Sequence, residues 1–355
     1  MHPGFKGRPL LRRRLGGLRV LYVWVRASPS RRRGARLASY GSYAAMAAAV
    51  GSALSRPDVV IASSPPLSVG AVGATVAKRF RVPWLLDVRD LWPEAAVALG
   101  ELSEGKALEF AEWLERRLYR SAAAITTPTE PFRASIAEKA PSAQKVTVLP
   151  NGTTAMWLET GTRAVDREGL GLPSDRFVWT YAGNLGLSQS LDDVIEAARL
   201  LGEGYQLVLI GHGPARDRLE ANAATLPPGA VIFKGTLPPR DCARWLRASD
   251  AVVVSLADDP ALAKSVPIKL YDSCAVGRPV IVAAPGEARR LSAEAGAAVT
   301  VPPEDPAALA DAVRRLHRDG DLRARMSHRA REFARAHTRE AQVPVLEDVL
   351  LRLRS

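Results

Sequence analysis

The segment 265–281, SVPIKLYDSCAVGRPVI, combines a cation and a carboxylate three residues apart, Lys269 and Asp272. We expect Pro267 to open a short helix that carries both side chains and Gly277 to end it. A lysine at a helix N-terminus favours phosphate, and a nearby carboxylate can accept hydrogen bonds from both hydroxyls of a ribose. These residues predict a sugar-nucleotide site. The competing interpretation is an ordinary strand–loop–helix unit in which Asp272 is a solvated first-turn charge.

The same segment resembles the Pro-Ser-Lys-hydrophobic-Tyr-Glu-Tyr…Ala-Gly-Lys/Arg-Pro-Val block of family-4 glycosyltransferases, which have the two-domain GT-B fold. In that family the acidic residue of the block binds the ribose of the nucleotide. The resemblance therefore implies this role for Asp272.

A glycine-containing loop at 181–191, YAGNLGLSQSL, adds to this interpretation. Gly183 and Gly186 would let backbone N–H groups approach a ligand, and the helix that follows would direct its positive end there, which suits a diphosphate. A plain tight connection would use the same residues. The motifs 209–214 (LIGHGP) and 233–237 (FKGTL) follow in the order of the family's C-terminal domain. The resemblance places these residues on the donor side: Gly183, Asn184, Gly235 and Thr236.

The donor motifs depart from the family pattern in their charges. Asn184 and Gln189 stand where many relatives carry Arg and Lys, and Lys264 occupies the first position of the Glu-x7-Glu pattern, with Asp272 at the second. Both loop cations are therefore absent. We expect Lys264 and Lys269 to replace them and to neutralise the departing diphosphate.

A second charged motif, 87–94 (DVRDLWPE), lies in the first half of the chain. Arg89 cannot act as a base near neutral pH, so Asp90 is the candidate for orienting an acceptor hydroxyl or stabilising oxocarbenium-like charge, with Asp87 and Glu94 as alternates. A structural role, in which Asp90 caps the loop and pairs with Arg89, is the competing interpretation. The motif is similar to the Asp-Ile-Arg-Asp-Leu-Trp-Pro-Glu block of bacterial transferases of the fucosamine-transferase type, which act in surface-polysaccharide assembly. The candidate catalytic residues of this motif are thus Asp90, Arg89 and Asp87.

The elements that must position these motifs alternate between short apolar runs and amphipathic helices, which predicts an α/β fold with parallel sheets. Such sheets bind ligands at the C-terminal ends of their strands, which places Ser64, at the end of the 58–66 run, on the acceptor side with Glu94. The expected strands are Leu18–Val25, Asp58–Ala62, Trp84–Asp87, Ala123–Thr126 and Val146–Leu149 in the first half, and Phe177–Ala182, Tyr205–Ile210, Val231–Lys234, Ala251–Val254, Pro279–Ala283 and Ala298–Val301 in the second.

A chain of 355 residues exceeds the size that one core usually serves, so two domains are expected. The turn signal at 150–152 sets the boundary. We predict an acceptor-side Rossmann-like domain over 1–150, a donor-binding Rossmann-like domain over 151–335, and a cleft between them. The resemblance implies that a helix within 336–355 crosses back onto the first domain. It also implies that the first domain lacks its first βα unit, since complete members open with a strand and a Gly-rich loop; that loss would expose unpaired strand groups.

The net charge of +12 has one source. Residues 1–57 contain twelve Lys or Arg and no acidic residue, and subtracting them from 49 leaves 37 basic against 37 acidic residues. The Arg clusters lack interleaved aromatics, which speaks against nucleic acid and favours an anionic membrane surface. An Arg-rich compositional bias would give the same pattern. The apolar run 37–54 is rich in Ala, Gly and Ser, which favours a buried helix over a membrane span.

Other possible sites have weak support. Cys242 and Cys274 match no metal spacing or redox pair, which fits a reducing cytoplasm. Asp258 and Asp259 are adjacent, but the GT-B fold uses helix dipoles and cations in place of a metal, so we expect no metal and no cofactor besides the nucleotide sugar as co-substrate. His212, in a turn, is expected to be solvated.

Together these features predict a retaining glycosyltransferase that moves a sugar from a nucleotide-diphosphate donor to a polyprenyl-linked or glycan acceptor in surface-polysaccharide synthesis. Retention is implied by the resemblance. The expected location is the cytoplasm, with peripheral attachment to the inner face of the plasma membrane as a further expectation. The alternatives are an inactive or truncated nucleotide-sugar binder and a sugar-nucleotide epimerase of GT-B fold, for which no matching carboxylate and histidine set is present.

Overall fold

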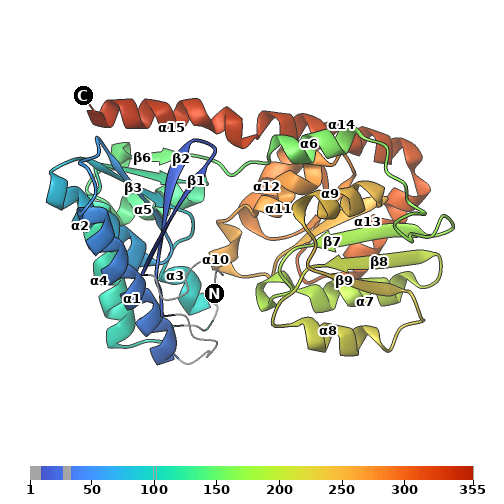
Figure 1. Cartoon of the computed structure of the whole chain (residues 1–355). Helices are drawn as coiled ribbons and strands as arrows, with labels where there is room; N and C mark the ends of the chain where they lie inside the picture. Colours follow the sequence, from blue (N-terminus) through green and yellow to red (C-terminus); the bar gives the residue numbers. More distant parts are fainter. Residues whose placement is uncertain (1–8, 27–32, 99, 101, 355) are drawn as a thin grey trace. The chain divides into compact units, whose positions relative to one another are not determined.

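A computed structural model describes residues 9–26, 33–98, 100 and 102–354 of the chain (Figure 1). Its contacts divide into two compact units. Unit 1 comprises Met1–Leu149 together with Val345–Ser355, and unit 2 comprises Pro150–Pro344. Each unit is described by itself below.

Unit 1 is built on a parallel four-stranded sheet in the order β3-β4-β5-β6. The central strands are buried and apolar, with Leu85, Leu86 and Ile125 fully inaccessible to water, as expected for a parallel sheet covered on both faces. Within the described residues β3 forms one edge of this sheet, and half of the Ile61 side chain is exposed there. The elements are α1 (Arg33–Ser52), β3 (Val60–Ser64), α2 (Leu67–Phe80), β4 (Trp84–Val88), α3 (Glu94–Ala98), α4 (Lys106–Ser121), β5 (Ala124–Thr127), α5 (Glu130–Lys139), η2 (Ala143–Lys145) and β6 (Val146–Val148).

One predicted strand of the parallel sheet is wrong. Strand β2 (Leu18–Val23) lies outside that sheet and pairs antiparallel with β1 (Leu10–Leu15), in a register that joins Leu15 to Leu18. The connecting Gly16 and Gly17 have positive φ values of 52° and 86°. A two-residue Gly-Gly turn of this kind joins antiparallel strands, whereas parallel strands need a long crossover. The dipeptide was the available signal for this hairpin.

Unit 2 contains a six-stranded parallel sheet in the order β12-β11-β10-β7-β8-β9. All six predicted strands are present, three of them with the predicted bounds. Residues from both faces are fully buried, including Trp179, Val208 and Ile281. The elements are α6 (Ala155–Thr162), β7 (Phe177–Ala182), η3 (Leu187–Gln189), α7 (Leu191–Leu201), β8 (Tyr205–Ile210), α8 (Arg216–Ala223), β9 (Val231–Gly235), α9 (Pro239–Ala248), β10 (Ala251–Ser255), α10 (Pro260–Ala263), α11 (Ile268–Ala275), β11 (Val280–Ala283), α12 (Gly286–Glu294), β12 (Ala298–Val301), α13 (Pro306–Arg318) and α14 (Gly320–Ala336).

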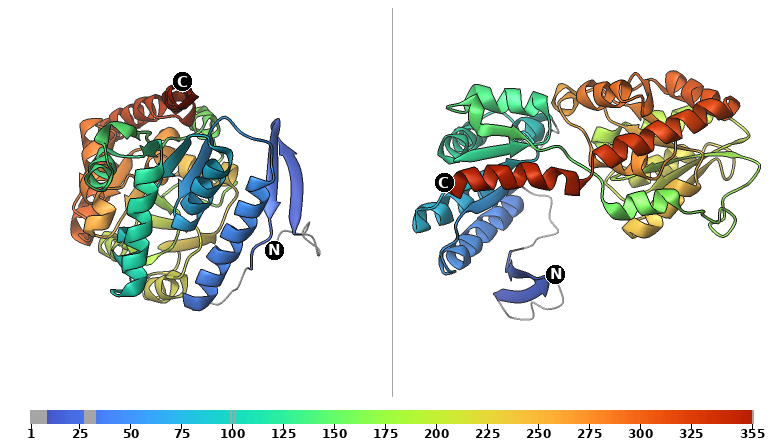
Figure 2. Two further views of the ribbon diagram at one scale, coloured as in Figure 1. Left: turned by 90° about the vertical axis from the view of Figure 1, so that its left-hand side faces the viewer. Right: turned by 90° about the horizontal axis from the view of Figure 1, so that it is seen from above.

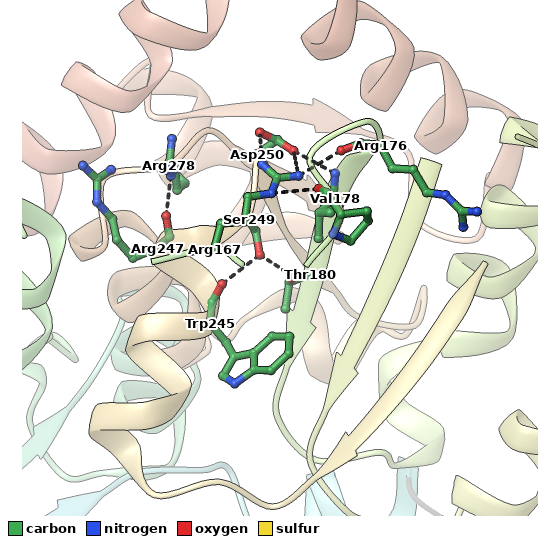
Figure 3. A network of polar contacts seen from close by, with 10 residues as sticks. Arg167, Arg176, Val178, Thr180, Trp245, Arg247, Ser249, Asp250 and Arg278 are labelled. Atoms are coloured by element: carbon green, nitrogen blue, oxygen red, sulfur yellow. Dashed lines mark hydrogen bonds and ion pairs between the residues drawn. The ribbon is translucent and has the colours of Figure 1, made fainter. Parts of the chain in front are cut away.

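The amino-terminal edge of this second sheet is fastened by a polar network (Figure 3). Arg167 donates two hydrogen bonds of 3.0 Å to the Asp250 carboxylate, which also accepts the Val178 N–H at 2.8 Å. Next to it, the hydroxyls of Ser249 and Thr180 lie 2.5 Å apart. The network fixes the start of β10 against β7, and its polar groups form hydrogen bonds with each other. A ligand site is therefore expected at the opposite, carboxyl edge.

The last helix, α15 (Arg339–Arg354), contributes to both units. Near its start, Arg339 donates to the Gly152 carbonyl, and its backbone N–H donates to the Thr153 carbonyl at 2.9 Å. Further on, Val349 is buried against Leu85 and Ala124 of the unit 1 sheet. Residues 336–344, which the sequence grouped with the terminal helix, make their contacts in unit 2.

Among the helices that the structure describes, none combines the length and the apolar character needed to cross a bilayer.

Candidate active site

The loops after β7, β8 and β9 meet at the carboxyl edge of the unit 2 sheet, because the strands are parallel. The Gly183 N–H donates to the Ile210 carbonyl at 2.9 Å, and the Gly211 N–H donates to the Gly235 carbonyl at 2.8 Å. A Cβ on Gly211, whose φ is 143°, would lie 1.8 Å from the Gly183 carbonyl oxygen. Gly211 is thus required for loop packing. Two predicted donor residues, Gly183 and Gly235, lie on neighbouring loops of this edge.

The Lys269 ammonium group, which comes from α11, lies next to the start of the loop 183–190. Its Nζ donates to the Tyr181 hydroxyl at 2.9 Å and to the Gln189 side-chain oxygen, and it lies 4.6 Å from the centre of the Tyr181 ring. A Cβ on Gly183 would be only 3.6 Å from this nitrogen. Desolvation of the ammonium lowers the pKa of Lys269 to about 7. The structure therefore places two of the predicted donor residues, Lys269 and Gly183, next to each other.

Two residues of this cluster were missed as functional candidates. Gln189 stands where relatives carry a cation, and its carbonyl oxygen accepts the Lys269 ammonium in the structure. Tyr181 donates to the Asn184 carbonyl at 2.8 Å and so fixes the loop. Asn184 itself is exposed, with its side-chain nitrogen close above Gly186. The signal in the sequence was that Gln189 replaces the cation of the family pattern, because an amide oxygen can accept a hydrogen bond from a cation that another element supplies.

The N-terminus of α7 is acidic. The Glu304 carboxylate accepts from the Ser190 hydroxyl at 3.2 Å and from the Asp258 N–H at 3.1 Å, and Asp192 and Asp193 lie in the first turn. Burial, together with Glu304 and Asp192, raises the pKa of Asp193. These charges disfavour a diphosphate at the first turn of α7 itself. The Lys269 ammonium, from α11, is a cation that lies next to this loop.

Asp272 lies on α11, one turn after Lys269. Its Oδ1 accepts from the hydroxyl of the fully buried Thr153 at 2.8 Å. Burial raises the pKa of Asp272 to about 6, against the opposing effects of the Thr153 hydrogen bond and of Arg339. The sequence indicated only a domain boundary at 150–152; in the structure Asn151 also donates to the Val266 carbonyl at 3.2 Å, just before α11. The turn therefore supports the predicted ribose-binding carboxylate.

The other predicted donor residues are Gly235 and Thr236, at and just after the end of β9, and Lys264, before α11. Gly235 ends β9 with a φ of 65°, and Thr236 is exposed in the loop to α9. Desolvation and the negative charge of Asp272 raise the pKa of Cys242, on the first turns of α9, to about 11, so this helix start lies near the carboxylate. Lys264 caps the C-terminal end of α10 and is half-buried.

In unit 1, the predicted catalytic motif follows β4. Asp87 accepts from the Ser63 hydroxyl at 3.1 Å and from the Thr126 hydroxyl at 2.9 Å, which join the carboxyl ends of β3, β4 and β5. Arg89 lies 3.6 Å from the same carboxylate. Ser63 and Thr126 were missed, because single hydroxyls after apolar runs carry no distinctive pattern. Asp87 has a structural part in holding this edge together.

The remaining acceptor-side residues lie beside this cluster. Asp90 is exposed as a residue, but protein atoms crowd its carboxylate, and this desolvation raises the pKa of Asp90 against the effect of Arg89. Ser64 is buried, and its carbonyl accepts the Arg89 N–H at 2.8 Å. Glu94 is half-buried at the first position of α3. Arg89 thus forms an ion pair with Asp87 and also acts electrostatically on the desolvated carboxylate of Asp90.

In the part of the chain that the structure describes, no group of three or more His, Cys, Asp or Glu side chains is arranged to hold an ion. Cys242 and Cys274 are free thiols.

Comparison with protein families assigns both units. Residues 4–152 match the glycosyl transferase 4-like domain, and residues 162–333 match the glycosyl transferases group 1. The chain belongs to the family-4 glycosyltransferases. This confirms the resemblance drawn from the 265–281 and 87–94 motifs.

Individual relatives are distant. The chain is 27% identical over 279 residues to the D-inositol 3-phosphate glycosyltransferase of Xylanimonas cellulosilytica, covering 75% of this chain and 65% of that protein. It is 29% identical over 229 residues to the alpha-D-kanosaminyltransferase of Streptomyces kanamyceticus, covering 62% and 58%. The matches span less than two thirds of the length of these curated relatives.

Solved structures with the same fold include glycosyltransferases. Sucrose-phosphate synthase from Thermosynechococcus elongatus superposes with a TM-score of 0.77 at 20% identity, covering 97% of this chain and 85% of that one. The Anabaena protein HepE in complex with UDP-glucose gives a TM-score of 0.71 at 16% identity, covering 90% and 84%. The predicted α/β fold of GT-B type is confirmed.

Proposed function

We propose that this protein is a glycosyltransferase that takes a sugar from a nucleotide-diphosphate donor bound to unit 2. The observation that carries the proposal is the placement of Lys269 and Asp272 one turn apart on α11, with the ammonium nitrogen next to Gly183 at the carboxyl edge of the sheet. An ammonium suits the diphosphate and a carboxylate suits the ribose hydroxyls. The match to the glycosyl transferases group 1 over 162–333 and the UDP-glucose bound by HepE support this choice of donor class.

The charge on the leaving diphosphate decides which residues assist the reaction. Lys269 would neutralise it at the moment the glycosidic bond breaks, with Lys264 as a second cation. Retention of the anomeric configuration, by front-side attack assisted by the diphosphate, is proposed from the family. Unit 1 would supply the acceptor side, with Asp90 orienting the attacking hydroxyl.

The acceptor is proposed to be a polyprenyl-linked or growing glycan in surface-polysaccharide synthesis, at the cytoplasmic face of the plasma membrane. The support is the 87–94 motif, which is similar to that of fucosamine-transferase-type enzymes. The inositol phosphate named for one relative is the competing type of acceptor. An assay that offers both a membrane extract and D-inositol 3-phosphate separates them.

Donor binding is the first test. Titration calorimetry with a panel of UDP, GDP and dTDP sugars should identify a donor whose affinity falls by about tenfold or more in Asp272→Asn, because the amide loses the charge that accepts the ribose hydroxyls. Asp311→Asn, an isosteric change at a carboxylate that is 76% exposed on α13, is the matched control and should bind as the parent does. Equal donor affinity in parent and Asp272→Asn would refute the assignment of this carboxylate.

Turnover is the second test. Incubation of the identified donor with and without membrane extract distinguishes sugar transfer from epimer formation and from binding without reaction. Transfer that is lost in Asp90→Asn while donor affinity is kept would support the acceptor-side role. Binding with no product under any condition would leave a nucleotide-sugar binder as the function and refute the transferase.

A further inference from the structure

A basic groove is lined by residues of α2 and α4. These two helices pack against each other in unit 1 (Figure 2). Its volume is about 860 Å³, and no acidic residue is among the described residues that line it; the nearby Glu112 of α4 lies 3.6 Å from Arg116. A neighbouring cavity of about 670 Å³ shares two of its cations and is likewise lined without an acid. The cations of the two cavities are Arg56, Lys78, Arg79, Arg81, Arg116, Arg117 and Arg120. We name these seven residues and the surface they line the basic groove.

An exposed aromatic pair borders the basic groove on α4. Phe110 is 60% exposed and Trp113 50% exposed, and their rings stack with centroids 5.7 Å apart. Spacings of three and four residues put Phe110, Trp113, Arg117 and Arg120 on one side of the helix. The Arg117 guanidinium lies 5.6 Å from the centre of the Trp113 ring. Two large aromatic rings held together in water beside arginines are a signature of an interaction surface.

The basic groove is separate from the candidate active site. Val82, Trp84 and Ser121, which line it, lie at the start of β4 and the end of α4. Asp87 and its hydroxyl partners lie at the other end of the same strand. A strand rises about 3.3 Å per residue, so the two regions are roughly 10 Å or more apart. The groove therefore has no part in the chemistry proposed for Asp90.

We propose that the basic groove docks unit 1 onto an anionic phospholipid bilayer. One guanidinium group can donate hydrogen bonds to two phosphate oxygens, so the groove suits phospholipid headgroups. Each basic residue near an anionic membrane surface adds to the electrostatic attraction. Phe110 and Trp113 would lie in the interfacial layer, where aromatic side chains collect. The sequence placed membrane attraction in residues 1–57, yet six of these seven cations lie outside that segment. The carboxyl edge that carries Asp87 stays free of the docked lipid.

Vesicle flotation tests the proposal on the full chain. The parent should float with vesicles made of equal parts phosphatidylcholine and phosphatidylglycerol at low salt, and not with phosphatidylcholine alone. The triple variant Arg116→Gln/Arg117→Gln/Arg120→Gln should partition roughly 100-fold less, since each cation contributes about fivefold. Glutamine keeps helix propensity close to that of arginine, so α4 should fold. Circular dichroism and an unchanged melting temperature confirm this.

The matched control removes the same charge elsewhere. Arg325→Gln/Arg329→Gln/Arg335→Gln changes three exposed arginines of α14 and should float as the parent does. A second control, Arg12→Gln/Arg13→Gln/Arg14→Gln, changes exposed residues of β1 and should lose far less binding than the α4 variant. An equal loss of vesicle binding in the α4 and α14 variants, or flotation that does not depend on the phosphatidylglycerol content, would overturn the proposal.

Tryptophan fluorescence gives an independent readout of contact. The chain has seven tryptophans, so the signal of Trp113 is the difference between the parent and Trp113→Phe. Vesicles with brominated acyl chains should quench that difference signal. No quenching, or binding of single-stranded DNA that the α4 variant loses while vesicle binding is unchanged, would refute a lipid occupant. Vesicle binding is measured without any sugar donor, so its outcome is independent of the transferase proposal.

Discussion

Donor affinity should depend on pH through Lys269. Because its pKa lies at about 7, the ammonium form falls from about nine tenths at pH 6 to one tenth at pH 8. An anionic diphosphate binds the charged form, so the loss of this form alone lowers the affinity about tenfold over this interval, or about 1.4 kcal/mol. Asp272 is half protonated at pH 6 and ionised at pH 8, which offsets about twofold and leaves a net drop of about fivefold. Below pH 6 protonation of Asp272, whose pKa is about 6, should weaken ribose binding. The expected profile has its maximum between about pH 6 and 7.

Calorimetry across this range measures the effect directly. The ligand should be an intact nucleotide sugar, because a terminal phosphate titrates near pH 6 whereas a diphosphate esterified at both ends does not. Lys269→Met keeps the length of the side chain without the charge and should bind weakly with no alkaline decline. Lys106→Met, at the exposed start of α4, should keep the parent profile. A parent affinity that is flat from pH 6 to 8, or an alkaline decline that persists in Lys269→Met, would refute the role given to the ammonium.

Three stability predictions follow from the packing. Gly211→Ala should lower the free energy of unfolding in urea by about 2–3 kcal/mol, since its Cβ would overlap the Gly183 carbonyl. Gly171→Ala, at a φ of 71° with open space around it, should lower it by only about 1 kcal/mol. Equal losses would contradict the loop packing. Asp250→Asn should cost about 1–2 kcal/mol, because it leaves Arg167 without its carboxylate at a site about one quarter exposed, and a neutral result would show that this ion pair contributes nothing. Val349→Ala should destabilise unit 1 by about 1–2 kcal/mol and raise hydrogen exchange of β4 and β5 amides; exchange raised only in unit 2 would contradict the docking of α15.

Strand existence was predictable because it depends on local pattern. Each strand of unit 2 is a short apolar run, and parallel strands are buried on both faces, so the run itself marks the element. The hairpin of β1 and β2 was missed because the arginines of β1 break any such run. The Gly-Gly turn was the signal that could have identified it, and that signal is confined to two residues.

The amino-acid sequence alone determined the apolar runs that form the strands and the residue types at the strand ends. These were enough to predict the fold, the family, and the presence of Lys269 and Asp272 on one helix. Only the tertiary structure decided what surrounds them. The Thr153 hydroxyl reaches Asp272 across 119 residues of sequence and Gln189 reaches Lys269 across 80, and the basic groove takes its cations from two helices. Periodicity and turn signals report on neighbours within a few residues, whereas desolvation and hydrogen bonding act between whatever groups the fold brings within about 3 Å.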